Sequence, residues 1–431
     1  MPRPEVAVVG GGITGLATAW FLRDRAAVTV YEASGRVGGK IETTSLLGVP
    51  VEAGPDTFLA RVPWAVDLCK ALGLGDELVA PATGKAYVWT RGRLRPLPEG
   101  TVLGVPRRLG PLARAGIVSP WGLARAGLDL VLPRPPAGGA DDRSVREVIG
   151  KRFGPEVVNR LVEPLLGGIH AGRADRLSLA AVAPQVAEAA GRSRSLLLGL
   201  RSGPAAGNGP VFLGLRGGLQ TLVDRLAKEV DVRLNTPVEP LADLGADAVV
   251  LAVPAYAAAR LVPAEAAREL EAIEYASVVT VTLAYAPDAL PGPLDGSGFL
   301  VPRVDGRLIT ACTWTSSKWP QPGADGVVLL RASAGRIGDD RALRLDDEAL
   351  VGRIHGELAE AMGLRAPPTG SLVSRWLRSF PQYDIGHVAR VARIEALLPP
   401  NVAVAGAAYR GVGIAACIHD AERAASAVAP H

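Results

Sequence analysis

Residues 5–24 read EVAVVGGGITGLATAWFLRD, and the expected fold follows from this segment. An apolar run that suits a buried strand leads into Gly10, Gly11 and Gly12, after which apolar residues recur at helical spacing. Glycine at the start of a helix costs conformational entropy, so its presence needs a physical reason. A tight turn that brings a phosphate close to the free N–H groups of a helix N-terminus supplies that reason. Gly10, Gly12 and Gly15 stand at the spacing of a dinucleotide-binding turn.

A second strand, AVTVYEA at 27–33, follows the helix and contains Glu32 near its end, about 20 residues after the glycines. A carboxylate at this position accepts hydrogen bonds from ribose hydroxyls. The glycine pattern alone also occurs in turns without a ligand, but here strand, glycines, helix and strand follow in the expected order. Two further glycine-bearing turns, SGRVGGK at 34–40 and EAGPDTF at 52–58, predict a long ligand such as a dinucleotide with a large second ring.

The composition is that of a globular chain of 431 residues, long enough for two or three domains. Lys and Arg number 47 against 43 Asp and Glu, and this excess of +4 is too small to indicate nucleic acid as a partner. Cys69, Cys312 and Cys417 show no metal-ligand spacing and no disulfide framework, so we expect no metal and buried thiols in a reducing compartment. No signal peptide and no apolar run of membrane-spanning length is visible, which makes the cytoplasm the expected location.

The segment from about 92 to 200 lacks strand signals and reads as a helical insertion. Ser144 with Glu147 predicts a capping box, and Pro155 suits the first turn of the next helix. The stretch at 107–136 carries several arginines beside Leu, Ile, Val and Trp. Two interpretations stay open: a helical pair packed on the core, which the frequent Pro and Gly favour, or a surface in weak peripheral contact with a membrane.

Strand and helix alternate again in the middle and at the end of the chain, which predicts an α/β fold with a discontinuous Rossmann-like domain. We also expect a substrate-binding domain with a mixed β-sheet. PRPPAGGADD, at 133–142, is the best linker candidate. The expected domains are the Rossmann-like one at 1–60, 205–255 and 376–431, the substrate-binding one at 61–91 and 256–375, and the helical one at 92–204.

Several motifs carry a resemblance to a known family. GGGITGL, YEASGRVGGK and EAGPDTF resemble the FAD-binding segments of amine-oxidase-like flavoproteins. EPLLGGIHAGRADRLS, GLRGGLQTLVDRLA and GAAYRGVGIAACI resemble the FAD-dependent protoporphyrinogen and coproporphyrinogen oxidases of haem synthesis. The match runs in order from Val6 to about Glu422, so the first expected domain would be an FAD-binding domain.

The resemblance also implies which residues touch FAD. The pyrophosphate would lie on the first glycine turn and the adenosine ribose on Glu32. A glycine turn that opens the last helix would face the flavin, and its N–H groups and dipole independently favour negative charge there. Trp376 would cover part of the flavin, although the sequence alone favours a core tryptophan. The implied FAD contacts are Gly10, Gly11, Gly12, Ile13, Thr14, Gly15, Glu32, Ala33, Lys40, Gly54, Pro55, Asp56, Thr57, Val238, Trp376, Val412, Gly413 and Ile414.

The substrate implied by the resemblance is a porphyrinogen, which loses six electrons in three two-electron steps through FAD to O2, giving H2O2. No catalytic base is indicated. Arg95 is a candidate substrate contact because GRLRPLPEG resembles a family stretch near the substrate, and a guanidinium binds carboxylates bidentately. A solvated surface arginine fits Arg95 equally. His170 either faces the substrate or packs. Arg173 stands where the family commonly has an acid, and either reorganises a local ion pair or adds positive charge for propionates.

We expect coproporphyrinogen III, with four propionates, as the substrate, because the chain lacks an obvious membrane anchor and has an arginine-rich insertion. Protoporphyrinogen IX, with two propionates, is the near alternative. An amine oxidase-like flavin oxidase is a more distant alternative, and a protein that stores FAD or haem without turnover is a third. A downstream enzyme of haem synthesis is a candidate partner.

Overall fold

The computed structural model describes residues 3–133, 142–202, 209–320 and 326–429. The described chain divides into two compact units, each assembled from separate segments. Unit 1 comprises Met1–Ala80, Asn208–Glu274 and Val388–His431, and unit 2 comprises Pro81–Gly207 and Tyr275–His387. The expected separation of a third, helical domain stays a prediction.

Unit 1 is built on a parallel sheet with strand order β12-β2-β1-β13-β19. Val8 of β1, at the centre, lies opposite Val30 on one side and Val250 on the other. All three valines are fully buried, as expected for a parallel sheet covered on both faces. The strands are β1 (Glu5–Val9), β2 (Ala27–Tyr31), β12 (Asp231–Arg233), β13 (Ala248–Leu251) and β19 (Val402–Val404).

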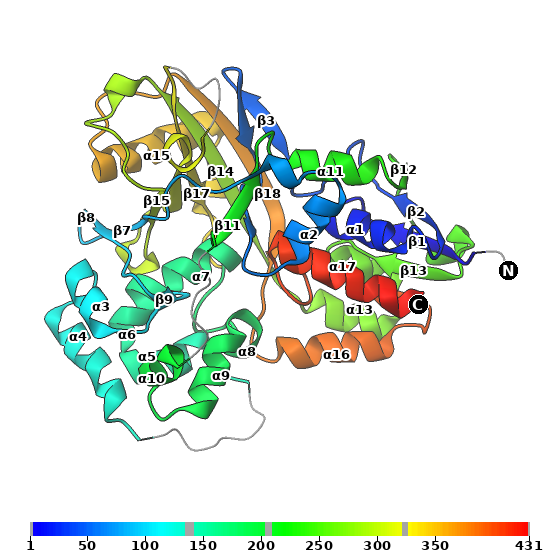
Figure 1. Cartoon of the computed structure of the whole chain (residues 1–431), viewed down its shortest axis with the longest axis horizontal. Helices are drawn as coiled ribbons and strands as arrows, with labels where there is room; N and C mark the ends of the chain where they lie inside the picture. The colour runs from blue at the N-terminus through cyan, green and yellow to red at the C-terminus, as the bar shows by residue number, and fades with distance from the viewer. Residues whose placement is uncertain (1–2, 134–141, 203–208, 321–325, 430–431) are drawn as a thin grey trace. The chain divides into compact units, whose positions relative to one another are not determined.

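Helices cover this sheet, and α1 (Ile13–Leu22) and α17 (Ile414–Val428) lie side by side in Figure 1. Leu16 of α1 and Ile418 of α17 belong to the same buried cluster. The predicted strand–helix–strand unit is therefore confirmed as β1, α1 and β2. The remaining helices of unit 1 are α2 (Trp64–Ala71), α11 (Gln220–Ala227), α12 (Ala255–Ala258), α13 (Ala264–Glu271) and most of α16 (His387–Leu397).

Short antiparallel strands complete unit 1. A hairpin joins β3 (Thr43–Leu46) to β4 (Val49–Glu52). The alternating part in the middle of the chain begins with β11 (Phe212–Leu215), which lies outside the parallel sheet. It pairs antiparallel with β5 (Phe58–Leu59) and β6 (Leu78–Val79) instead. Short apolar runs predict a strand without predicting its partner, because pairing is set by contacts remote in sequence.

Unit 2 contains a mixed sheet with strand order β18-β14-β17-β16-β15-β7-β8. Neighbouring strands are antiparallel except β15 and β7, which pair in parallel. Helix α15 (Asp347–Met362) buries Leu350, Ile354 and Leu358 in the core of this sheet. The strands are β7 (Tyr87–Thr90), β8 (Arg93–Pro96), β14 (Tyr275–Tyr285), β15 (Gly298–Leu300), β16 (Ile309–Trp314), β17 (Val328–Ala334) and β18 (Gly370–Pro381).

The segment expected to be helical from about 92 begins instead with β8, β9 (Thr101–Val102) and β10 (Val105–Pro106), and its helices start only after these strands. Ser144 Oγ accepts a hydrogen bond from the Glu147 N–H at 3.0 Å, and Pro155 opens the first turn of α6 (Pro155–Val157). A π-helical turn, Val158–Val162, leads into α7. The helices are α3 (Leu109–Ala115), α4 (Pro120–Gly127), α5 (Val145–Phe153), α7 (Glu163–His170), α8 (Leu179–Val182), α9 (Pro184–Arg192) and α10 (Leu196–Arg201).

Helices α3 and α4 form the helical pair that the arginine-rich stretch predicts (Figure 1). Leu112 of α3 and Ala126 of α4 are fully buried, as expected if the helical pair packs on the core. Trp121 on α4 and Val131 beyond it are exposed, so peripheral membrane contact stays a prediction. In the part of the chain that the structure describes, no helix has the length and apolar content needed to cross a membrane. The linker candidate falls almost wholly on residues 134–141, outside the described residues.

Candidate functional site

The first glycine turn of unit 1 uses its glycines in three different ways. At Gly10, φ is +110° and an added Cβ would lie 2.7 Å from the Ala252 carbonyl oxygen, so the tight turn excludes a side chain. At Gly15 a Cβ would lie 1.8 Å from the Gly10 oxygen, so close packing of helix on strand excludes one too. At Gly12, the residue before α1, a Cβ would meet no atom within 4 Å. The open space at Gly12 is therefore on the side where a ligand can approach.

Glu32 stands directly after β2 and is held against the same turn. Its Oε2 accepts a hydrogen bond from the Gly11 N–H at 2.7 Å, and its Oε1 accepts two from Ser34, from N–H at 2.8 Å and Oγ at 2.7 Å. A carboxylate offers about four acceptor positions, so Glu32 keeps capacity for ribose hydroxyls. Ala33 is exposed beside it.

A second glycine turn lies against the first. The Gly38 N–H donates to the Gly11 carbonyl at 2.8 Å, and Gly39 lies close to Gly12. Arg36 fixes this turn by donating from its guanidinium to the carbonyls of Gly39 and Ile41. Sequence reasoning missed Arg36, although RVGGK places it next to the glycines that it supports.

The glycine turn before α17 provides a second uncapped helix N-terminus. Gly411 has φ +146°, and a Cβ there would lie 2.5 Å from the Ala416 Cβ, so this position requires glycine. Gly413 precedes the helix without a side-chain cap, and a Cβ there would meet nothing within 4 Å. Val412 lies between these glycines, and Ile414 is buried at the helix start. The N–H groups at the start of α17, next to Gly413, are therefore available to a ligand.

The N-terminal turns of α1 and α17 come together in unit 1. The Thr14 side chain lies beside the thiol of Cys417, and a Cβ at Gly406 would lie 3.3 Å from Thr14 Oγ1. Lys40 lies near Cys417 as well, and burial lowers the pKa of its ammonium. Among the described residues Lys40 has no ion-pair partner. Two uncapped helix N-termini and an unpaired lysine make this place suitable for an anionic ligand.

Asp420 of α17 anchors the loop that leads to the glycine turn at 411–413, and sequence reasoning missed it. It is 2% exposed and accepts hydrogen bonds from the Gly406 N–H at 2.9 Å and from Arg423 Nε at 2.8 Å. Arg410 Nη1 lies 3.4 Å from the same carboxylate and also donates to Glu395. The only signal in the sequence is an Asp–Arg pair three residues apart on a helix.

The other predicted FAD contacts are distributed over both units. Gly54, Pro55, Asp56 and Thr57 follow β4 in unit 1, with Gly54 buried and the others half-buried. Val238 follows β12, also in unit 1, and is half-buried. Trp376 is a half-buried residue of β18 in unit 2, and its role toward a flavin stays a prediction.

The three candidate substrate contacts all belong to unit 2. Arg95, on β8, has a buried Nε without an acceptor, and its guanidinium has no carboxylate partner among the described residues. Arg173 donates two hydrogen bonds to Asp175, at 3.0 and 2.6 Å, so its charge is used in a local ion pair.

His170, at the end of α7, is buried beside the rings of Tyr383 and His387. Burial, with a smaller contribution from His387, lowers the pKa of His170 to about 4. Its ring is therefore neutral at physiological pH, and its buried Nδ1 has no hydrogen-bond partner among the described residues.

Comparison with known proteins identifies the family. The family of flavin-containing amine oxidoreductases matches residues 13–429. The chain belongs to this family. The predicted fold class and the predicted flavin cofactor are thereby confirmed. The chain is 36% identical to coproporphyrinogen III oxidase of Bacillus subtilis (strain 168), over 98% of this chain and 97% of the relative.

Other relatives are also similar in sequence to this chain over nearly its whole length. Coproporphyrinogen III oxidase of Mycobacterium tuberculosis (strain H37Rv) is 37% identical over 99% of this chain and 97% of its own. Protoporphyrinogen oxidase of Bos taurus is 31% identical over 98% of both chains. A crystal structure from Exiguobacterium sp. 255-15 carries the provisional name protoporphyrinogen oxidase. It superimposes on this chain with a TM-score of 0.89, at 32% sequence identity and over 99% of both chains.

Proposed function

We propose that this chain oxidises coproporphyrinogen III to coproporphyrin III in haem synthesis. The observation that carries the proposal is the near full-length similarity, at 36–37% identity, to coproporphyrinogen III oxidases of two bacteria. The glycine turns, the uncapped helices and the unpaired Lys40 support it, because a flavin enzyme of this family needs a site for an anionic dinucleotide.

We assign FAD to unit 1 by the residues that fit it. The pyrophosphate would lie on the open side of Gly12 at the start of α1, with Lys40 supplying positive charge. Glu32 would accept from the adenosine ribose. The N–H groups at Gly413 would face the isoalloxazine, where the positive end of the α17 dipole stabilises negative charge. When bound, FAD would supply two-electron oxidation with O2 as the electron acceptor, and three rounds would give one porphyrin and three H2O2.

The substrate demands little chemistry from side chains but needs anchoring and orientation. Porphyrinogen carboxylates call for arginine, whose planar fork matches a carboxylate. Arg95 fits this role because it is a partly buried arginine of unit 2 without a carboxylate partner among the described residues. The neutral His170 contributes no positive charge to such binding.

The direct test is turnover of coproporphyrinogen III in air, followed by porphyrin fluorescence and an oxygen electrode. We expect fluorescence of coproporphyrin III to appear faster than in the absence of enzyme, with three O2 consumed per porphyrin formed. Acid precipitation of the protein should release FAD. A protein that retains FAD and forms no porphyrin above the uncatalysed rate would contradict the proposal and leave a binding role.

Oxidation of protoporphyrinogen IX is the second candidate function. It is favoured by the 31% identity to the Bos taurus protoporphyrinogen oxidase over 98% of this chain. Both candidates use the same flavin chemistry and differ in the number of substrate carboxylates. The kinetics of the two substrates therefore distinguish them.

A further inference from the structure

Arg336 of unit 2 is an almost buried arginine in a turn directly after β17. The residue is 7% exposed, and the turn is closed by hydrogen bonds between the backbones of Arg336 and Asp339. A guanidinium is always charged near neutral pH, and burying one is costly unless acceptors surround it. The hydrogen-bond partners of Arg336 therefore decide whether its role is structural.

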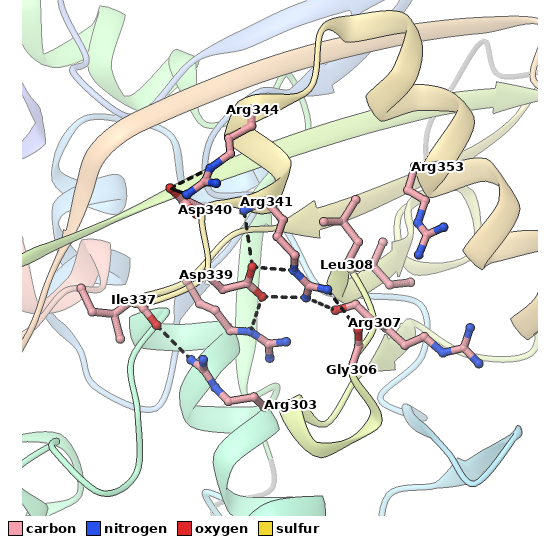
Figure 2. A network of polar contacts seen from close by, with 12 residues as sticks. Arg303, Gly306, Arg307, Leu308, Ile337, Asp339, Asp340, Arg341, Arg344 and Arg353 are labelled. Atoms are coloured by element: carbon pink, nitrogen blue, oxygen red, sulfur yellow. Dashed lines mark hydrogen bonds and ion pairs between the residues drawn. The ribbon is translucent and has the colours of Figure 1, made fainter.

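The nearest carboxylate, Asp339, is already used by another arginine. Figure 2 shows Arg341 donating to both oxygens of Asp339, from Nε at 2.8 Å and from Nη2 at 2.8 Å. Arg341 also donates to the carbonyls of Gly306 and Arg307. Arg336 Nε lies 3.6 Å from Asp339, beyond hydrogen-bonding distance. Asp339 therefore balances part of the charge of Arg336 without accepting a hydrogen bond from it.

The second carboxylate of the cluster is also shared. Glu163, at the start of α7, is buried and lies 3.3 Å from Arg146 Nη2 and 3.8 Å from Arg303 Nε. Arg303 repels Arg336, and burial together with this repulsion lowers the pKa of Arg336 to about 10. Arg336 therefore remains charged at neutral pH. Two carboxylates, Glu163 and Asp339, are shared among four guanidinium groups, those of Arg146, Arg303, Arg336 and Arg341.

The guanidinium of Arg336 donates no hydrogen bond to any described residue. Its Nε is enclosed without an acceptor, whereas its two terminal amino groups are not enclosed. Buried donors in native proteins almost always have an acceptor. A fork of two amino groups that lacks a protein acceptor is suited to a carboxylate from outside the chain.

The turn is also attached to the end of helix α7. The Ile337 N–H donates to the Ala171 carbonyl at 2.8 Å, next to the end of α7. Arg303 Nη2 donates to the Ile337 carbonyl at 3.2 Å, as Figure 2 shows, which ties Arg303 to the same turn. The motif LLGGIHAG, at 165–172, thus ends beside Arg336.

We infer that Arg336, supported by Arg303, is a carboxylate-binding site that takes one propionate of the porphyrinogen. The inference rests on the proposed function, because the substrate is what supplies the carboxylate. Arg336 would bind the propionate through its two terminal amino groups, and Arg303 would add positive charge without replacing that fork. Because the carboxylate is present in substrate and product alike, this contact contributes mainly to KM.

The test compares Arg336→Met with Arg344→Met as the matched control. Arg344 lies in the same segment, is 75% exposed at its side chain and pairs with Asp340. Fluorescence titration with coproporphyrin III and with its tetramethyl ester, in the same detergent buffer, measures binding without turnover. We expect Arg336→Met to weaken coproporphyrin III binding about ten- to a hundredfold and to leave the ester unaffected. Its KM for coproporphyrinogen III should rise while kcat changes little, and Arg344→Met should resemble the wild type.

Several outcomes would overturn the site. Unchanged affinity of Arg336→Met for coproporphyrin III removes the residue from binding, and an equal loss for the ester shows a structural effect. If Arg336→Met does not fold, Arg336→Lys can replace it, because lysine keeps the charge but lacks the planar fork. Arg336→Lys should weaken binding of coproporphyrin III and leave binding of its ester unchanged. A wild type that binds acid and ester equally contradicts the site without any variant. If the wild type turns over coproporphyrinogen III and Arg336→Met binds and reacts like the wild type, only the carboxylate site is rejected. If the wild type binds the acid more tightly than the ester but shows no turnover, only the proposed oxidase function is rejected.

Discussion

Variants of Gly12 and Gly15 distinguish the proposed binding of FAD from packing of the protein. A side chain at Gly12 meets no protein atom within 4 Å, whereas one at Gly15 would lie 1.8 Å from the Gly10 oxygen. Gly12→Val should therefore fold with nearly wild-type thermal stability and retain no FAD, because the valine would occupy the space proposed for the pyrophosphate. Gly15→Val should fail to fold. Flavin content after purification and reconstitution with FAD, together with circular dichroism melting, checks both expectations.

Gly292→Val is a suitable control, since Gly292 of unit 2 also has open space around it. Its FAD content should equal that of the wild type. Normal FAD content in Gly12→Val would remove the pyrophosphate from the first glycine turn.

Arg95 is expected to contribute to affinity for the four-carboxylate substrate. Arg95→Ala should lower kcat/KM for coproporphyrinogen III about ten- to a hundredfold, since a lost hydrogen bond between charged groups is worth about 1.5–3 kcal/mol. The loss should be smaller for protoporphyrinogen IX if the contact serves one of the two additional propionates. Higher salt should also weaken binding of coproporphyrinogen III more than binding of protoporphyrinogen IX. Steady-state kinetics at two ionic strengths measure this, and equal kinetics in variant and wild type would return Arg95 to a surface role.

His170 makes the stability of the folded chain depend on pH. Its pKa in the folded state is about 4, against about 6.5 when unfolded, because burial disfavours the charged ring. The unfolded state therefore binds a proton as the pH falls through 6.5, and stability present above that pH is lost toward pH 4. The free energy of unfolding should fall by about 2 kcal/mol from this group between pH 7.5 and 5. Urea unfolding of His170→Phe should lack this decrease, and parallel pH curves for variant and wild type would contradict the assignment.

At the scale of elements, helix α17 has two features that bear on the proposed FAD site. Its N-terminus presents free N–H groups at Gly413, and about two turns later Asp420 holds the preceding loop through the Gly406 N–H. The buried carboxylate also neutralises Arg423, which donates to it at 2.8 Å. The shape of the glycine turn at 411–413 therefore depends on a residue that does not itself face the candidate flavin site.

Asp420→Asn should weaken FAD binding and lower stability together. The loss of a charged hydrogen-bond acceptor should destabilise the chain by about 1.5–3 kcal/mol and raise the Kd for FAD severalfold. Glu422→Gln, on the same helix but exposed, should change neither quantity. Titration of the apoprotein with FAD and thermal melting provide the measurements. A destabilised variant with wild-type FAD affinity would assign Asp420 a purely structural role.

Local signals account for what the sequence predicted well. The β1–α1–β2 unit and the Ser144 cap depend on residues close together in the chain, so spacing and residue type revealed them. The three cysteines are free and buried, as their spacing indicated. By contrast, the partners of β11 come from residues more than 130 positions away, and no local pattern encodes that pairing.

At the scale of the whole molecule, the candidate residues divide between the two units. Unit 1 holds the glycine turns, Glu32 and Lys40, and unit 2 holds Arg95, His170 and the Arg336 cluster. The sequence motifs pointed to nearly all of the first group, because phosphate binding requires glycines at fixed spacing. They did not reveal Arg336, because its environment is created by Arg303 and Glu163, which are distant in sequence and meet only in the fold.

The most direct test of the central claim is the ratio of kcat/KM for coproporphyrinogen III to that for protoporphyrinogen IX, measured by product fluorescence on the FAD-loaded wild type. The account predicts a ratio well above one at low ionic strength, and a decrease as salt screens the additional propionates. A ratio below one would contradict the substrate assignment and favour protoporphyrinogen oxidase. No turnover of either substrate by the FAD-loaded protein would contradict the proposed oxidase function itself.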